Sequence, residues 1–285
     1  MTDLKFILDT LETGSDEFLT ENHTAQLAAN PHYDEVYIRW NKLFAKADAR
    51  KLSVIRSVYS VQIWCDITRA AVNSIVQLPN IRALHLLGIS RSGRLDGLRT
   101  AEALEEFSCQ WGVSSSDLLQ IAQLPIVRKL TAHGARITEE SLAALLGKPS
   151  LTELDFEESK FSDCFARMVS QSKTITALEL GATDITKVGL QAICKMSQLR
   201  WLDIWSTGIV EHDLKMLSQL PNLEYLSIGG HDGQTTFTAA GTLATLYEIP
   251  SLKTVWLDGL HVTKQDWGTL TDRFEKVWVS SVIDG

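Results

Sequence analysis

The sequence predicts a repeat solenoid of the α/β class, with a parallel β-sheet of about ten strands and a short helix after most strands. Three observations support this prediction. An apolar pattern L-x-x-L-x-L recurs along most of the chain, its copies start about 24 residues apart, and apolar residues at helical spacing follow each copy. One such repeat cannot bury its apolar face alone, so successive repeats must stack around a shared core. We therefore expect a single solenoid over residues 56–285.

The first half of each repeat has the alternation of a short β-strand. The copies start at Val58, Ile81, Leu104, Val127, Leu151, Ile175, Leu199, Leu223, Leu252 and Phe274. Because side chains alternate along a strand, positions 1, 4 and 6 of the pattern should face the core, whereas positions 3, 5 and 7 should point out of the sheet. A slip of one residue would exchange these two sets.

The second half of each repeat predicts a helix with one buried face. Leu190 and Ile193 show the three-residue spacing in one repeat, and Leu142 and Leu145 show it in another. Turns such as Leu-Pro-Asn at residues 78–80 then lead to the next strand. Residues 88–103 fit the repeat worst, so we expect an irregular outer side there.

Residues 1–55 show no repeat and are predicted to form a helical N-terminal cap on the first strand. Two groups of apolar residues there have helical spacing: Leu4, Ile7, Leu8 and Leu11, and then Val36, Trp40, Leu43 and Phe44. Pro31 can open the second helix. No Pro-, Gly- or Ser-rich linker separates this region from the repeats. A discrete small helical domain is the alternative.

The composition is that of a soluble globular protein with an acidic balance. Lys and Arg total 27 against 35 Asp and Glu, a formal net charge of −8. This disfavours nucleic acids and anionic membranes as partners, because both require a basic face. The N-terminus lacks the pattern of a secretory signal, and the four cysteines are far apart. We expect a cytoplasmic protein with free thiols.

The segment ITALELGATDITKVGLQAICKMSQ, starting at Ile175, resembles the bacterial variant of the leucine-rich repeat family. The resemblance covers roughly residues 58–281 and is strongest in the four repeats from residue 151. It implies a horseshoe whose strands line the concave face and whose short helices lie on the convex side.

The outward strand positions are rich in aromatic and acidic residues. They hold five of the eight tryptophans: Trp64, Trp201, Trp205, Trp256 and Trp278. Their acidic residues are Glu106, Glu153, Asp155, Glu157, Glu179, Asp203 and Asp258, against the two basic residues Lys129 and Lys276. Exposed Trp and Tyr dominate protein–protein hot spots, and carboxylates attract basic partners. The alternative is that Trp residues fill the inner curve or lie under the caps, above all Trp64 and Trp278.

We predict a partner-binding surface on this face. Its candidate residues are Trp201, Asp203, Trp205, Tyr225, Trp256, Asp258, Glu153, Asp155, Glu157, Glu179, Trp111 and His231. Trp111 sits one position beyond its strand. His231 lies in a repeat that has five extra residues after its strand and that contains Gly229–Gln234. Two simpler interpretations are also possible. The acidic residues around Glu157 could form an ordinary solvated surface, and the five extra residues could be a tolerated surface loop.

Catalytic and metal motifs are absent from the sequence. It contains no HExxH, GxxxxGK[ST] or GxGxxG motif, and the histidines, His85 and His133 among them, are scattered. We therefore expect no enzyme activity, no catalytic or metal-binding residues and no cofactor.

The leading hypothesis is a non-enzymatic protein that sequesters a basic folded partner. The resemblance adds a precedent: the ribonuclease inhibitor branch of the family occludes a basic enzyme with an acidic, Trp-lined face. In a small bacterial-type chain this suggests an immunity protein that neutralises a toxin. One alternative is an adaptor that docks through residues 1–55. Another is a carbohydrate-binding protein, whose binding would persist at high salt because sugars are uncharged.

Overall fold

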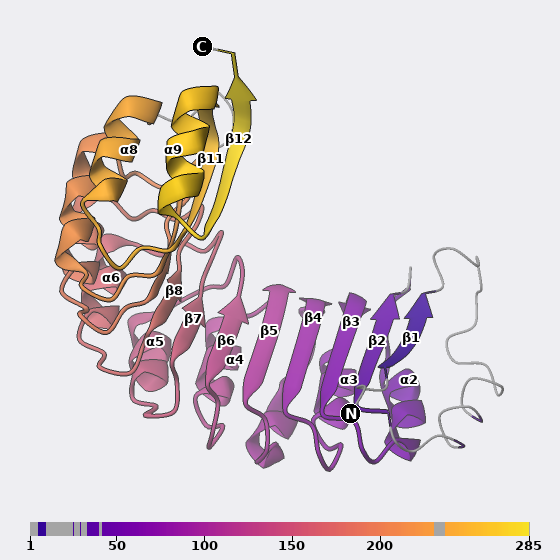
Figure 1. The fold of residues 1–285 in the computed structure, drawn as a ribbon. Coiled ribbons are helices and arrows are strands. Elements are labelled where there is room, and N and C mark those ends of the chain that lie inside the picture. Colours follow the sequence, from indigo (N-terminus) through magenta and orange to yellow (C-terminus); the bar gives the residue numbers. More distant parts are fainter. Residues whose placement is uncertain are drawn as a thin grey trace. The chain divides into compact units, whose positions relative to one another are not determined.

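Each repeat of the chain folds into a strand, a turn and a short helix in the computed structural model, which describes residues 5–9, 25, 29, 33–39, 42–230 and 237–284. The chain divides into two units, Met1–Leu151 and Thr152–Gly285, here called unit 1 and unit 2. In both units the helices lie on one side of the strands (Figure 1). The predicted α/β repeat solenoid with a parallel sheet is confirmed.

Unit 1 contains six described strands, which pair in parallel and in chain order. They are β1 (Lys5–Asp9), β2 (Glu35–Arg39), β3 (Ser60–Ile67), β4 (Ala83–Ile89), β5 (Glu106–Trp111) and β6 (Lys129–Ala132). Between and after them come α2 (Lys46–Lys51), η1 (Leu52–Val54), α3 (Arg69–Ile75), η2 (Asp96–Thr100), α4 (Ser115–Ile121) and α5 (Glu139–Leu146).

Unit 2 also contains six described strands in parallel and in chain order. They are β7 (Glu153–Asp155), β8 (Ala177–Glu179), β9 (Trp201–Asp203), β10 (Tyr225–Gly229), β11 (Thr254–Thr263) and β12 (Lys276–Ile283). The helices of this unit are α6 (Asp163–Val169), α7 (Lys187–Ile193), η3 (Glu211–Gln219), α8 (Ala239–Tyr247) and α9 (Lys264–Arg273).

The core consists of apolar ladders that run from strand to strand. Leu178, Leu202 and Leu226 stand in register on three neighbouring strands, and each is completely buried. Each such leucine contributes about 1.5–3 kcal/mol through burial. Position 4 of the repeat therefore faces the core, as predicted, and the register is the one that the sequence indicated.

The turn after the strand is also repeated. Glu158, Ala182 and Ser206 occupy the left-handed region, with φ of 57°, 52° and 50°, in three successive repeats of unit 2. Non-glycine residues rarely adopt this conformation, so the stacked repeats around them must hold it in place. The chain therefore leaves the strand through the same backbone turn in each of these three repeats.

The prediction of helices across residues 4–11 and 36–44 was wrong. Strand β1 contains Ile7 and Leu8, and β2 contains Val36 and Ile38, which are both buried. The reason is that β2 pairs with β3, so the alternation in Glu35–Arg39 outweighs the helical spacing. The described residues thus contain two strands more than the ten expected. Leu4, Leu11, Pro31 and Trp40 lie outside the described residues.

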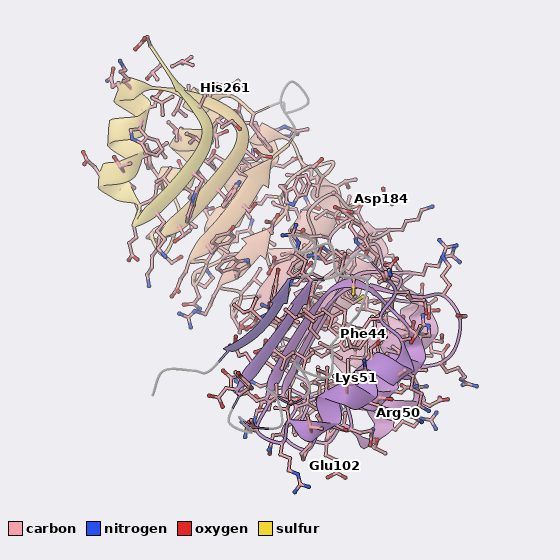
Figure 2. All side chains as sticks on the ribbon, turned by 90° about the vertical axis from the view of Figure 1, so that its right-hand side faces the viewer. Phe44, Arg50, Lys51, Glu102, Asp184 and His261 are labelled. Atoms are coloured by element: carbon pink, nitrogen blue, oxygen red, sulfur yellow. The ribbon has the colours of Figure 1, made fainter. Side chains whose placement is uncertain are left out.

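A helix does form within residues 1–55, at α2. Phe44, which lies just before α2, is completely buried, and Arg50 on α2 is exposed (Figure 2). Whether residues 1–55 act as a cap or as a separate module stays a prediction. In residues 88–103 the expected irregular outer side is present, because the 3-10 helix η2 takes the place of an α-helix.

Candidate functional site

Strands β9, β10 and β11 of unit 2 place the main candidate residues next to one another. Trp201 pairs in register with Tyr225, and Gly229 pairs with Asp258. Outward positions of successive repeats therefore form rows across the sheet. We call the set Trp201, Asp203, Trp205, Tyr225, Trp256 and Asp258 the aromatic–acidic surface.

Two stacked aromatic pairs dominate this surface. The rings of Trp201 and Tyr225 have centroids 3.4 Å apart and planes inclined by 6°. The rings of Trp256 and Trp278 are 5.1 Å apart and inclined by 20°. Trp201, Trp256 and Trp278 remain 38%, 42% and 40% exposed. The predicted exposure of these tryptophans is thus observed, and Trp278 joins a site from which sequence reasoning had set it aside.

Between the aromatic pairs lies a hollow of about 340 Å³. Its lining residues are Asp203, Trp205, Tyr225, Ser227, Trp256 and Asp258. A volume of this size is at the lower end of the range of small-ligand pockets, about 300–1,000 Å³. It can take a single side chain of a partner or one small molecule. Ser227 was missed because its residue type alone carries no binding signal.

Asp203 lies in this hollow as a buried carboxyl group. The register predicts that it points out of the sheet, yet the surrounding side chains leave it only 7% exposed. Burial raises the pKa of Asp203 to about 7, although hydrogen bonds with Trp205 and Ser227 act in the opposite direction. The backbone N–H of Trp205 donates to Asp203 Oδ1 at 3.0 Å. A cationic group entering the hollow would favour the ionised form of this carboxyl.

Tyr225 shares this environment. Burial, followed by the charges of Asp203 and Glu179, raises the pKa of the Tyr225 hydroxyl to about 12. Tyr225 therefore stays neutral at physiological pH and contributes its ring rather than a charge.

Trp205 is half-buried, and its indole lies against residue 181 of the preceding repeat. Its Nε1–H donates to Glu157 Oε1 at 3.3 Å, which links it to the acidic residues of β7 and the turn that follows. A Cβ atom at residue 181 would lie 2.0 Å from Trp205 Nε1, so Gly181 leaves the space that the indole occupies. Gly181 was missed by the sequence analysis. A signal existed, because residue 181 occupies the strand position of the preceding repeat equivalent to that of Trp205.

The remaining acidic candidates lie on or next to β7 and β8. Glu153, Glu157 and Glu179 are half-buried, whereas Asp155 is only 7% exposed. Asp155 Oδ1 accepts a hydrogen bond from the Glu157 N–H at 3.1 Å. Asp155 and Asp203 occupy outward positions of their strands, yet neighbouring rows of side chains cover both carboxyl groups.

Two candidates fall outside this group. Trp111 belongs to unit 1, where it ends β5 and is 48% exposed. A Cβ at Gly88 on the neighbouring strand would contact the Trp111 Cδ1 at 3.4 Å. His231 lies outside the described residues. His261, which is described, is exposed on β11, with its Nδ1 2.6 Å from Ser281 Oγ (Figure 2).

The buried thiols are chemically inert at neutral pH. Burial raises the pKa of Cys65, Cys109 and Cys194 to about 12. The reactive form of cysteine is the thiolate, so these three side chains serve as core residues. Among the described helices, none has the length and apolar character needed to cross a membrane.

Comparison with known proteins supports the repeat architecture. An internalin (inlF) of Listeria monocytogenes aligns with a TM-score of 0.50 and 18% identity, over 90% of this chain and 78% of that chain. A leucine-rich repeat protein of Leptospira interrogans aligns with a TM-score of 0.55 and 18% identity, over 91% of this chain and 64% of that chain. At this identity the likeness concerns the fold alone. No family model matches the chain.

A plant protein is similar in sequence to part of the chain. The chain is 27% identical over 130 residues to receptor-like protein EIX1 of Solanum lycopersicum. This match covers 45% of the chain and 12% of the relative, so the chain spans only a small part of that protein's length. The chain therefore has the fold of leucine-rich repeat proteins. Solenoids of stacked repeats generally present extended binding surfaces.

Proposed function

We propose that the aromatic–acidic surface of unit 2 binds a basic folded protein and sequesters it. The observation that carries the proposal is the pair of exposed aromatic stacks on either side of a hollow that contains the carboxyl of Asp203. Exposed Trp and Tyr rings bury a large area at little entropic cost, and they attract Arg and Lys through their faces. The Asp203 and Asp258 carboxyls, which line the same hollow, offer acceptors to such a cation.

The partner that fits this surface is a basic toxin or enzyme, and the protein acts as its inhibitor or immunity protein in the cytoplasm. The net charge of −8 supports fast, electrostatically steered capture of a basic protein. The role of inhibitor rests on analogy with the ribonuclease inhibitor branch of the repeat family. Three buried thiols in the core are compatible with a reducing compartment.

The test is a binding measurement with matched tryptophan variants. A basic protein captured from the native lysate at low salt is purified, and its dissociation constant is measured by calorimetry. Trp201→Ala and Trp256→Ala should each weaken binding by about 2–4 kcal/mol, in the range of hot-spot residues. The control is Trp64→Ala in unit 1, because Trp64 has the same 38% exposure as Trp201. Equal losses in all three variants, or none in the first two, would contradict the proposal.

A carbohydrate ligand is the second candidate. The hollow of about 340 Å³ with aromatic walls and two carboxyl groups also suits a sugar ring, which stacks on Trp and donates hydroxyl protons. Salt distinguishes the two functions. Binding of a basic protein weakens when the ionic strength rises from about 0.05 to 0.5 M, whereas binding of a neutral sugar persists.

A further inference from the structure

Four arginines line a cavity of about 390 Å³ in unit 1, although the chain as a whole is acidic. Arg69, Arg91, Arg94 and Arg136 line it, together with Ser114 and Asp117 among others. The turn that follows β4 contributes Arg91 and Arg94, and this is the segment whose sequence fits the repeat worst. The segment that departs from the repeat pattern therefore forms part of the cavity wall.

Two of the four guanidinium groups are already neutralised. Arg69 and Asp117 form an ion pair that is 4% and 3% exposed. The Arg69 Nε–H also donates to the Ser90 carbonyl at 2.9 Å, and Asp117 Oδ2 accepts from the Ser114 hydroxyl at 2.6 Å. This carboxylate would repel an anion, but Arg69 cancels its charge. Arg94 Nε lies 3.6 Å from Asp96 Oδ1, and both side chains are exposed.

Arg91 and Arg136 remain as uncompensated charges. Both are exposed, and neither forms an ion pair with any residue that the structure describes. The cavity thus carries an excess of two positive charges within a chain of net charge −8. Placing like charges around one concavity costs free energy unless an anion neutralises them.

Backbone geometry keeps the cavity open. Gly93 and Gly112 line it with φ of 98° and 91°, a conformation that side chains rarely adopt. A Cβ at Gly112 would lie 2.2 Å from the Ile89 carbonyl oxygen. The turns can therefore approach one another closely only with glycine at this position.

We infer that this cavity binds a small phosphomonoester. A guanidinium group presents paired N–H donors that match phosphate oxygens, and a monoester carries a charge of about −1.5 to −2 at neutral pH. That charge balances Arg91 and Arg136 together. The volume lies within the range of small-ligand sites, about 300–1,000 Å³, so the ligand is a metabolite rather than a polymer. The inference is independent of the aromatic–acidic surface.

The test measures binding of defined anions to the full chain by calorimetry and phosphorus NMR. The probes are inorganic phosphate, glycerol 3-phosphate, adenosine monophosphate and, as a non-phosphate dianion, succinate. Arg91→Gln and Arg136→Gln should each weaken phosphomonoester binding by about tenfold or more, and the double variant should abolish it. The control is Arg167→Gln on α6 of unit 2, which changes the charge equally on an exposed residue.

The outcomes are distinct. If an ester binds more tightly than inorganic phosphate, the site also contacts the rest of the metabolite. If both bind equally, the site contacts the phosphate group alone. Succinate binding as tightly as the esters would overturn the assignment to phosphate. So would equal binding by the arginine variants, or no saturable binding below about 10 mM. Circular dichroism of each variant checks that it is folded.

Discussion

Gly181 sets the position of Trp205, because a Cβ at residue 181 would lie 2.0 Å from the indole Nε1. Gly181→Ala should therefore displace the indole and break its hydrogen bond to Glu157. Trp205 is half-buried and can move outwards, so we expect a loss of stability of about 1–3 kcal/mol, typical of an overpacked site. Near-ultraviolet circular dichroism and tryptophan emission report the displacement.

The matched control for this substitution is Gly268→Ala on α9, where a Cβ meets nothing within 4 Å. That variant should keep the wild-type spectra and gain a few tenths of a kcal/mol to about 1 kcal/mol from helix propensity. Unchanged aromatic spectra in Gly181→Ala would contradict the placement of Trp205.

Asp203 should make stability depend on pH in an unusual direction. Its pKa is about 7 in the folded protein and about 3.9 when unfolded. The folded state therefore binds more protons between these values, and the contribution of Asp203 to stability falls as pH rises from about 4 to 7. The Asp203→Asn variant lacks this ionisation. The free energy of unfolding of the variant minus that of wild type should therefore increase by on the order of 4 kcal/mol between about pH 4 and 7.

Urea unfolding of both proteins at several pH values tests this prediction. The matched control is Asp184→Asn, which removes the same charge from an exposed position. A stability difference between Asp203→Asn and wild type that stays constant over this pH window would mean that Asp203 is hydrated and ionised in the folded protein.

At the scale of elements, Asp163 joins one repeat to the next. It begins α6, yet its Oδ1 accepts from the backbone N–H groups of Thr186 and Gly189 at 2.8 and 2.9 Å, at the start of α7. Asp163→Ala leaves these donors without a partner and should cost about 1–3 kcal/mol. Asp184→Ala, which removes an exposed carboxylate labelled in Figure 2, should stay within about 0.5 kcal/mol of wild type. Thermal unfolding monitored by circular dichroism measures both; equal effects would exclude the capping role.

The same arrangement recurs one helix pair later in unit 2. Glu211 on η3 accepts from the backbone N–H and hydroxyl of Thr238 at 2.6 and 2.8 Å, just before α8. A turn residue also forms a hydrogen bond to the preceding repeat: the Asn222 side chain donates to the Ser197 carbonyl at 2.8 Å. Polar contacts between neighbours thus reinforce the apolar ladders and fix the stacking of the repeats.

At the scale of the whole molecule, we predict that residues 1–55 belong to the solenoid and are not a docking module. Val36, Ile38 and Phe44 are almost completely buried, and β2 pairs along β3. Deletion of residues 1–55 should therefore expose the edge of β3 and unfold or aggregate unit 1. Circular dichroism and size-exclusion chromatography measure the outcome.

The point variant Ile38→Ala complements this deletion, because it keeps the chain intact. We expect it to lose about 2–4 kcal/mol, as for a buried residue whose cavity stays open. A folded, monomeric deletion variant with wild-type melting temperature would instead support a separate module and the adaptor hypothesis.

The repeats, their register and the outward rows of Trp201, Tyr225 and Trp256 were determined by the sequence alone. The reason is local: alternation within a strand and a period of about 24 residues are visible in any one repeat and its neighbour. Only the tertiary structure decided that Glu35–Arg39 is a strand, that Asp203 is buried and that Arg91 and Arg136 share a cavity. Each of these depends on which side chains and backbone edges a residue meets in adjacent repeats, and those contacts exist only once the repeats have stacked.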